Sequence, residues 1–348
     1  MPKSAIDAIG PAFRQTQRQL FRPFRFGRWM RFSIIALATG EFASTGWGGS
    51  GIRIPANRGE RKIGMLFQSA SDSNWGPDAG SLAVVGIAVL ATIVLILAWM
   101  YVASVFRFIL LESVLQDRCE IMQGWRRWRP QGGRYFVWML ALSGAVLAGL
   151  VVIIGAPVLI AWRAGVFDNP REHLVLLIAG GLTMLVVVGG LVLTTALLAL
   201  LGKDFLVPVL ALENLTLKQA LKRLGSLIRA EKLHYAGYFA MRIVLSFGSA
   251  ILFGIVDLIV LFITLVPVAL AAFGIIAIAQ AGGLSWNVLT ISAAIVSGSV
   301  IITGLLWLLA FIYTPGLVFF QSYPLHFLSS RYPPLAELEA QAPVPPYQ

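Results

Sequence analysis

The sequence predicts an all-α membrane protein, a polytopic bundle of transmembrane helices with short amphipathic helices at the membrane surface. Of its 348 residues, 58% are hydrophobic and only 12% are charged, and the mean hydropathy is +0.81. Soluble domains carry about 25% charged residues. The apolar residues also gather in runs of the length that crosses a bilayer, about 20 residues. These observations exclude a soluble globular enzyme, a disordered chain and a disulfide-stapled secreted module.

Six apolar runs are the candidate spans, and they cover residues 32–44, 82–106, 136–162, 173–201, 237–279 and 287–320. The fifth run contains Pro267 and is far longer than one crossing requires, so it forms either one long helix or two crossings. We therefore expect about six spans, with seven as the alternative.

The first run, residues 32–44, is short and contains Glu41. A basic segment followed by a short apolar run resembles a secretory signal. However, about 31 residues precede this run, and Glu41 interrupts it. We interpret the run as a retained first span, with cleavage near residues 42–44 as the alternative.

Positive charge predicts the orientation. The formal net charge is +11, and most of the 27 Lys and Arg residues lie in residues 1–31, 107–135 and 202–242. Basic segments stay on the cytoplasmic side of a membrane, where they face anionic headgroups. We expect both termini in the cytoplasm and anionic lipid headgroups, not nucleic acid, as the partner of these charges.

The chain divides into a basic amphipathic arm (1–31), a transmembrane helical domain (32–328) and a Pro-rich tail (329–348). In the arm, phenylalanines alternate with arginines. That pattern suits a segment lying among lipid headgroups, and it equally suits aromatic packing against neighbouring helices.

Two segments form a candidate cytoplasmic contact surface. The first, an expected loop at residues 124–135, contains Trp125, Arg126, Arg127 and Trp128. Aromatic and arginine side chains together can bind single-stranded nucleic acid. Beside a bilayer, an interfacial anchor is the better interpretation.

The second segment starts at Thr216, which forms a capping box with Gln219 and predicts a helix start. Its leucines recur on one helical face, and its basic residues occupy the other faces: Lys218, Lys222, Arg223 and Arg229. The pattern predicts a short helix over 216–229 in the membrane plane. The alternative is a coupling helix that docks a cytosolic protein.

Charged residues inside apolar runs are functional candidates, because an unpaired charge in hydrocarbon is costly. They are Glu41, Asp204, Arg242 and Asp257. Asp204 and Arg242 end neighbouring spans on the same side, so we expect an ion pair between them. Asp257 is about 22 Å further along the Arg242 helix and should lie near the outer interface. A transport pathway through Glu41 or Asp257 is the alternative.

Catalytic patterns are missing from the sequence. Its three histidines fall on different segments, and it has one cysteine, Cys119. It contains no paired metal-ligand motif and no nucleophile elbow. We therefore expect no cofactor and no enzymatic activity. Small residues at Gly144, Gly149, 180–181 and 189–190 suggest close helix contacts instead.

Four short segments carry a resemblance, and they cover residues 204–209 (DFLVPV), 217–220, 238–245 and 315–323. They resemble bacterial six-helix proteins related to the membrane domain of glycerophosphoryl diester phosphodiesterases. The resemblance implies an integral protein of the bacterial cytoplasmic membrane. It does not imply phosphodiesterase activity, since that chemistry belongs to a soluble barrel that this sequence lacks.

The sequence thus favours a non-enzymatic membrane protein that acts as a scaffold or accessory to a membrane or cytosolic partner protein. A transporter or lipid-handling protein is the alternative, and a membrane-embedded hydrolase is the third. The oligomeric state and the identity of any partner or substrate are not encoded in these patterns.

Overall fold

The computed structural model describes residues 4–22, 24–41, 79–116, 119–167, 173–282 and 288–335. Regular structure in these ranges is entirely helical, which confirms the predicted all-α class. The elements are α1 (Ile9–Phe21), α2 (Phe26–Thr39), α4 (Ala79–Gln116), α5 (Ile121–Arg163), α6 (Leu174–Leu201), the π-helical turn η2 (Gly202–Leu206), α7 (Val207–Glu213), α8 (Leu217–Ala230), α9 (Lys232–Ala281) and α10 (Val288–Ser329).

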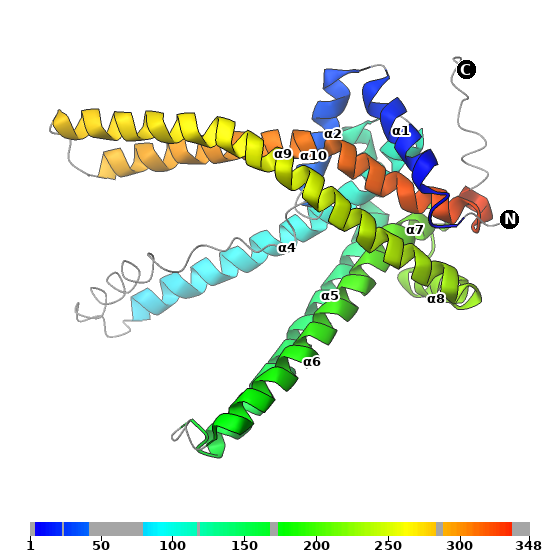
Figure 1. The fold of residues 1–348 in the computed structure, drawn as a ribbon, viewed down its shortest axis with the longest axis horizontal. Coiled ribbons are helices and arrows are strands. Elements are labelled where there is room, and N and C mark those ends of the chain that lie inside the picture. The colour runs from blue at the N-terminus through cyan, green and yellow to red at the C-terminus, as the bar shows by residue number, and fades with distance from the viewer. Residues whose placement is uncertain are drawn as a thin grey trace.

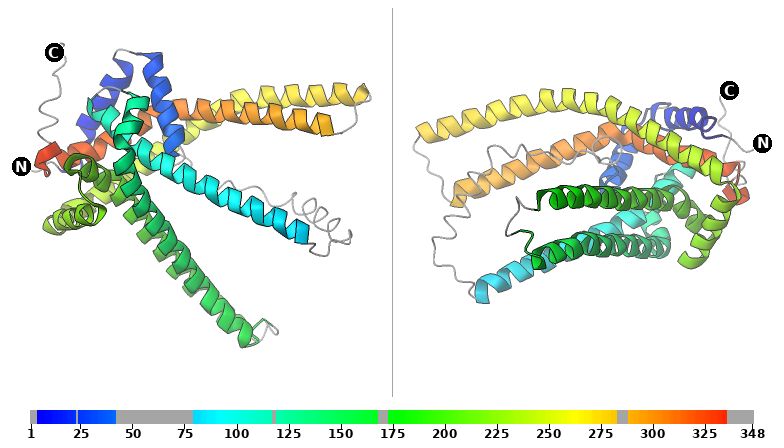
Figure 2. Two further views of the ribbon diagram at one scale, coloured as in Figure 1. Left: turned by 180° about the vertical axis from the view of Figure 1, so that it is seen from behind. Right: turned by 60° about the horizontal axis from the view of Figure 1, so that its bottom comes forward.

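The molecule consists of a hub and three arms (Figure 1). The hub contains α1, α2, η2, α7 and α8 together with the adjoining ends of the long helices. One arm is α4, the second is the antiparallel pair α5–α6, and the third is the pair α9–α10. All three arms leave the hub on the same side, and α1 and the end of α10 both lie at the hub (Figure 2).

The arms have the properties of membrane spans. Five helices in the described residues are long and apolar enough to cross a membrane: α4, α5, α6 continued through α7, α9 and α10. The most apolar stretches of the first four contain no buried residue. Large side chains such as Ile87 and Leu258 are 68% and 72% exposed. Because water disfavours apolar surface on this scale, lipid is the medium that the arms fit.

The expected first span, residues 32–44, is not among these five helices. Its described part belongs to α2, which ends at Thr39 and is capped by the left-handed Gly40. With 14 residues, α2 is about 21 Å long, which is short of the roughly 30 Å hydrocarbon core. It also buries Phe32, Ile35 and Ala36 within the hub. Residues 42–44 lie outside the described ranges.

The described residues thus contain five candidate spans, and the break in the fifth apolar run that would give a seventh span is absent. Seven spans required a break within residues 237–279, but α9 is continuous from Lys232 to Ala281 through Pro267. The expected loop at 124–135 is wrong as well, because these residues form the start of α5 despite Pro130. Trp125 and Trp128 pack on α4, which stabilises this helical turn against its poor intrinsic propensity.

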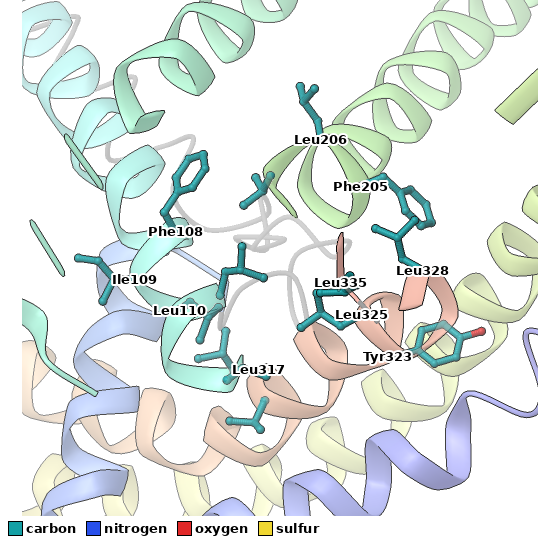
Figure 3. Close-up of a cluster of buried hydrophobic side chains, with 14 of the residues drawn as sticks. Phe108, Ile109, Leu110, Phe205, Leu206, Leu317, Tyr323, Leu325, Leu328 and Leu335 are labelled. Atoms are coloured by element: carbon teal, nitrogen blue, oxygen red, sulfur yellow. The ribbon is translucent and has the colours of Figure 1, made fainter. Parts of the chain in front are cut away.

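The hydrophobic core lies in the hub. Figure 3 shows its centre, where side chains of α4, η2 and α10 meet. Phe205 of η2 packs edge-on against Tyr238 of α9 at 5.0 Å, and Tyr238 stacks on Tyr323 of α10 at 5.1 Å. Each long helix thus contributes its hub end to one core, while its other end is exposed.

The basic N-terminal segment, residues 1–31, is joined to this core by hydrogen bonds and aromatic contacts. The side-chain amides of Gln15 and Gln19 both donate to the carbonyl of Val114 at the end of α4, at 3.0 and 2.7 Å. Trp29 donates to the Leu20 carbonyl and packs on Phe311. Phe13, however, is 62% exposed. Some aromatic side chains of this N-terminal segment therefore pack on helices, and others are exposed and can contact the membrane surface.

The Pro-rich tail is described only as far as residue 335. Tyr332 and Leu335 are buried in the hub. Arg331 donates to Glu231 at 2.6 Å, which joins the start of the tail to the turn between α8 and α9. The remaining tail residues, 336–348, lie outside the described ranges.

Candidate functional site

Five charged side chains meet where the arms enter the hub, and we call them the junction cluster. They come from four separate parts of the chain: Glu41 after α2, Arg107 of α4, Lys203 and Asp204 of η2, and Arg242 of α9. The cluster therefore joins the hub to the bases of all three arms, since η2 continues α6.

The carboxylates hold the cations in two linked groups. Lys203 Nζ lies 2.9 Å from Glu41 Oε2, and Arg107 Nε lies 3.7 Å from Glu41 Oε1. Arg242 Nε lies 3.4 Å from Asp204 Oδ2, so the expected Asp204–Arg242 ion pair is present. Because Lys203 and Asp204 are consecutive residues, the two groups form one network.

Two tyrosines extend the network. Tyr238 donates to Asp204 Oδ2 at 2.7 Å. The Tyr135 hydroxyl is hydrogen-bonded to Arg107. Both tyrosines are fully buried, and they anchor the charges to the aromatic core of the hub and to α5.

The cluster is buried, and the charges that the structure describes in it sum to a net positive charge. Glu41 and Arg242 are each 4% exposed and Asp204 is 1% exposed. Three cations face two carboxylates, and electrostatic interactions connect Glu41 and Lys203 with the other charges of the network. Removing charges from water is costly unless they are paired, so a surplus cation at this depth calls for a further anion.

The π-helical turn sets the positions of Lys203 and Asp204. It begins at Gly202, and a Cβ atom there would lie 2.6 Å from Trp138 Nε1 on α5. Only glycine permits this close approach of η2 to the indole. Turns of this kind, inserted within α-helices, are frequent at functional sites.

Among the described residues, several polar atoms at the junction have no hydrogen-bond partner, although the Nε atoms of Arg107 and Arg242 lie 3.7 and 3.4 Å from carboxylate oxygens. Four are donors, namely Arg107 Nε, Arg242 Nε and Nη1, and Trp138 Nε1, and one is an acceptor, Asp204 Oδ1. The Arg242 guanidinium also lies over the Phe320 ring, 4.1 Å from its centroid. Buried polar groups are normally hydrogen-bonded, so this group of donors is unusual.

Asp257 is separate from the cluster. It lies in the α9–α10 arm, where it is 4% exposed and accepts a hydrogen bond from Tyr313 of α10. Of the four polar candidates, the structure thus brings together Glu41, Asp204 and Arg242 and leaves Asp257 apart.

The candidate contact surface divides into inward and outward residues. Trp128 is 9% exposed, stacks on Phe108 and donates to Glu112, and Trp125 packs against Tyr101 and Phe106. The outward residues are the exposed basic ones: Arg126, Arg127, Lys218, Lys222, Arg223 and Arg229. Two of them have partners, Arg127 with Glu112 at 2.8 Å and Arg223 with Glu213 at 3.7 Å.

Sequence reasoning missed Arg107, Lys203, Tyr135 and Trp138. Arg107 and Lys203 lie just outside the apolar runs, so they looked like ordinary loop charges. A usable signal existed, because Arg107 directly follows the run 82–106 and Lys203 lies two residues after the run 173–201. Basic residues at the same boundary of neighbouring spans are predicted to meet.

Comparison with known proteins identifies the family. Residues 3–338 match the family model described as Family of unknown function (DUF7544). The chain belongs to this family. No curated protein and no solved structure matches the chain. In the described residues, no group of three or more His, Cys, Asp or Glu side chains could hold a metal ion.

Proposed function

We propose that this DUF7544 member is a non-enzymatic scaffold of the bacterial cytoplasmic membrane that binds an acidic partner protein through the basic surface of α8. In this proposal the arms cross the membrane and the hub, with both termini, faces the cytoplasm. The concentration of basic residues at the hub supports that orientation.

The packing of α8 carries the proposal. Its apolar side is already used by protein, because Ala220 and Leu224 are buried and Leu217, Leu221 and Ile228 pack against the core. A helix that lies in the membrane surface needs its apolar face for lipid. A basic helix whose apolar face is occupied is better suited to a protein partner.

The position of α8 is fixed by its neighbours. The capping box of Thr216 and Gln219 is formed, which confirms the predicted helix start. Arg134 of α5 donates to the carbonyls of Asn214 and Leu215 at 3.0 and 2.7 Å, where the chain turns into α8. A rigidly held helix loses little conformational entropy when it binds a partner.

Charge complementarity indicates the partner's chemistry. Lys218, Lys222 and Arg229 are exposed on α8 and have no ion pair in the described residues. The transporter alternative has weaker support, because Glu41, Asp204 and Arg242 are engaged in ion pairs. An acidic surface of a cytosolic or membrane protein therefore suits α8 best.

Charge reversal on α8 tests the proposal with the full chain in its native membrane. The test variant is Lys218→Glu/Lys222→Glu/Arg229→Glu. The matched control is Arg14→Glu/Arg18→Glu/Arg22→Glu, which changes the same charge at exposed positions of α1 and the turn that follows it. A photocrosslinking residue in place of Ser226, on α8, reports what contacts this helix in each protein.

We expect Ser226 to crosslink one acidic protein in the wild type and in the α1 control, with the adduct lost in the α8 variant at equal abundance of the chain. Adducts formed only with lipid, or equal adducts in all three proteins, would contradict the proposal. Deletion of residues 216–229 is a poorer test, because it would also remove Ala220 and Leu224 from the hub core.

A further inference from the structure

We propose that the junction cluster binds a phosphate group, carried by an anionic phospholipid whose acyl chains lie along the exposed faces of the arms. This site is distinct from the α8 surface and does not depend on the scaffold role.

The described charges of the junction cluster do not balance. Arg107, Lys203 and Arg242 carry three positive charges, and Glu41 and Asp204 supply two negative ones. One more anion would balance the buried charges. A phosphate diester carries one negative charge and several acceptor oxygens, which is the chemistry that arginine and lysine recognise.

Two buried hydrogen-bond donors of the junction have no acceptor among the described residues. Arg242 is 4% exposed, and its Nη1 has no hydrogen-bond partner among the described residues, while its Nε lies 3.4 Å from Asp204 Oδ2 in the ion pair. Trp138 Nε1 likewise has no hydrogen-bond partner in this part of the chain. The Trp138 indole lies against Gly202, the residue that precedes Lys203 in the sequence. On α5, Trp138 follows Tyr135 by about one helical turn. Unpaired buried donors are costly, and a bound phosphate would satisfy them.

The three cations of the cluster lie at one level relative to the membrane. Arg107 lies at the hub end of the apolar run of α4, Lys203 at that of α6 and Arg242 at that of α9. With the arms in the hydrocarbon, these three residues lie at the level of lipid phosphates. The side chains of Arg107 and Lys203 remain 17% and 13% exposed, so the cations can be reached from the surface.

Exposed apolar side chains adjoin this level and would contact acyl chains. Ile243, one residue after Arg242, is 44% exposed, and Val137, next to Trp138, is 54% exposed. A phospholipid with its phosphate at the junction would therefore place its tails against side chains that water disfavours. Free phosphate shares only the headgroup chemistry, so the two sources can be separated by experiment.

The experiment uses the purified full-length chain in a neutral detergent and measures ligand binding by native mass spectrometry. The probes are phosphatidylglycerol, phosphatidylcholine and inorganic phosphate. The principal variant is Trp138→Phe, which removes the indole N–H, and its control is Trp162→Phe at the far end of the same helix, where the side chain is 70% exposed.

We expect phosphatidylglycerol to bind in preference to phosphatidylcholine, with about tenfold weaker binding in Trp138→Phe through loss of one hydrogen bond to a charged group. Trp162→Phe should bind as the wild type does. If inorganic phosphate binds with the same sensitivity to Trp138→Phe and phosphatidylglycerol gains nothing from its tails, the phosphate site stands but its lipid source is overturned. Equal binding of the two phospholipids, or wild-type affinity in Trp138→Phe, would overturn the proposal.

A second variant separates binding from folding. Asp204→Asn removes one negative charge but keeps a side-chain oxygen that can accept from Tyr238. A purely structural cluster would only lose stability in this variant, whereas a phosphate site should bind phosphatidylglycerol more tightly because its positive charge increases. Unchanged or weaker binding by folded Asp204→Asn would count against the site. Neither result bears on whether α8 binds a protein.

Discussion

Lys203 Nζ lies 2.9 Å from Glu41 Oε2, and this contact joins the π-helical turn after α6 to the end of α2. It connects a helix that fits a membrane span to one that is too short to be one. The pair thereby holds α2 in the hub, and it explains why a charged residue interrupts the first apolar run.

Removing Lys203 should therefore destabilise the protein strongly. Lys203→Met leaves the Glu41 carboxylate buried without its nearest cation, and loss of one partner of a buried pair costs about 3–5 kcal/mol. The double variant Glu41→Gln/Lys203→Met should recover much of this loss. Chemical unfolding of the purified protein in detergent measures both. A control is Arg223→Met, which breaks a half-exposed pair with Glu213 and should cost at most about 1 kcal/mol. Equal losses in the two single variants would refute the buried-pair assignment.

Adjacent glycines of α5 should respond oppositely to alanine. A Cβ at Gly132 would lie 2.6 Å from Val105 Cγ2 and 2.9 Å from Val105 Cα on α4, whereas a Cβ at Gly133 would meet nothing within 4 Å. Gly132→Ala must push α4 and α5 apart and should cost at least about 1–3 kcal/mol. Gly133→Ala should be neutral or stabilising by up to about 1 kcal/mol, since alanine favours the helix. Thermal unfolding of the two variants distinguishes them, and a stable Gly132→Ala protein would contradict the α4–α5 packing.

Cys119 should react slowly with thiol reagents. It is 8% exposed, and burial raises the pKa of its thiol above the ordinary value. The thiolate is the reactive form, so a raised pKa lowers its fraction at neutral pH, and the rate should increase as the pH rises. The comparison is Ser226→Cys in a Cys119→Ala background, with the new thiol on the exposed face of α8. Maleimide labelling of native membranes should be at least about tenfold faster for Ser226→Cys. Similar rates at pH 7 would show that Cys119 is accessible.

The Asp257–Tyr313 contact should stabilise the α9–α10 arm. Tyr313→Phe removes the donor to a buried carboxylate, and a buried group left unsatisfied costs about 1–3 kcal/mol. Tyr101→Phe is the matched change, because the Tyr101 hydroxyl only accepts a long 3.3 Å bond from exposed Arg129. When unfolding is measured in detergent, the Tyr313→Phe protein should be clearly less stable than the Tyr101→Phe protein. The reverse ranking would show that Asp257 does not depend on this tyrosine.

The sequence predicted the structural features that depend on residues within one segment or at the ends of adjacent spans. The helix predicted over 216–229 forms as Leu217–Ala230 with its capping box, because cap and periodicity lie within that segment. The pair of Asp204 and Arg242 could be anticipated because both end adjacent spans. The Glu41–Lys203 contact could not, since it depends on how α2 packs in the hub.

Composition alone also could not separate lipid-facing from protein-facing apolar residues. The second half of α2 belongs to an apolar run in the sequence, yet Phe32 and Ile35 are buried in protein. Small residues were similarly ambiguous. A Cβ at Gly144, Gly180 or Gly189 would meet nothing within 4 Å, whereas one at Gly149 would lie 3.2 Å from Leu191 Cδ2 of α6, as predicted, and the closest approaches occur at Gly132 and Gly202. Which glycines matter is set by tertiary packing.

The central claim is that the hub and the arm tips lie on opposite sides of a membrane. Single cysteines at Ser226 of α8 and at Arg163, the end of α5, in a Cys119→Ala background test it directly. A membrane-impermeant maleimide is applied to right-side-out and inside-out vesicles of the membrane that contains the protein. We predict that Ser226→Cys reacts only in inside-out vesicles and Arg163→Cys only in right-side-out vesicles. Labelling of both cysteines from the same side would contradict the account.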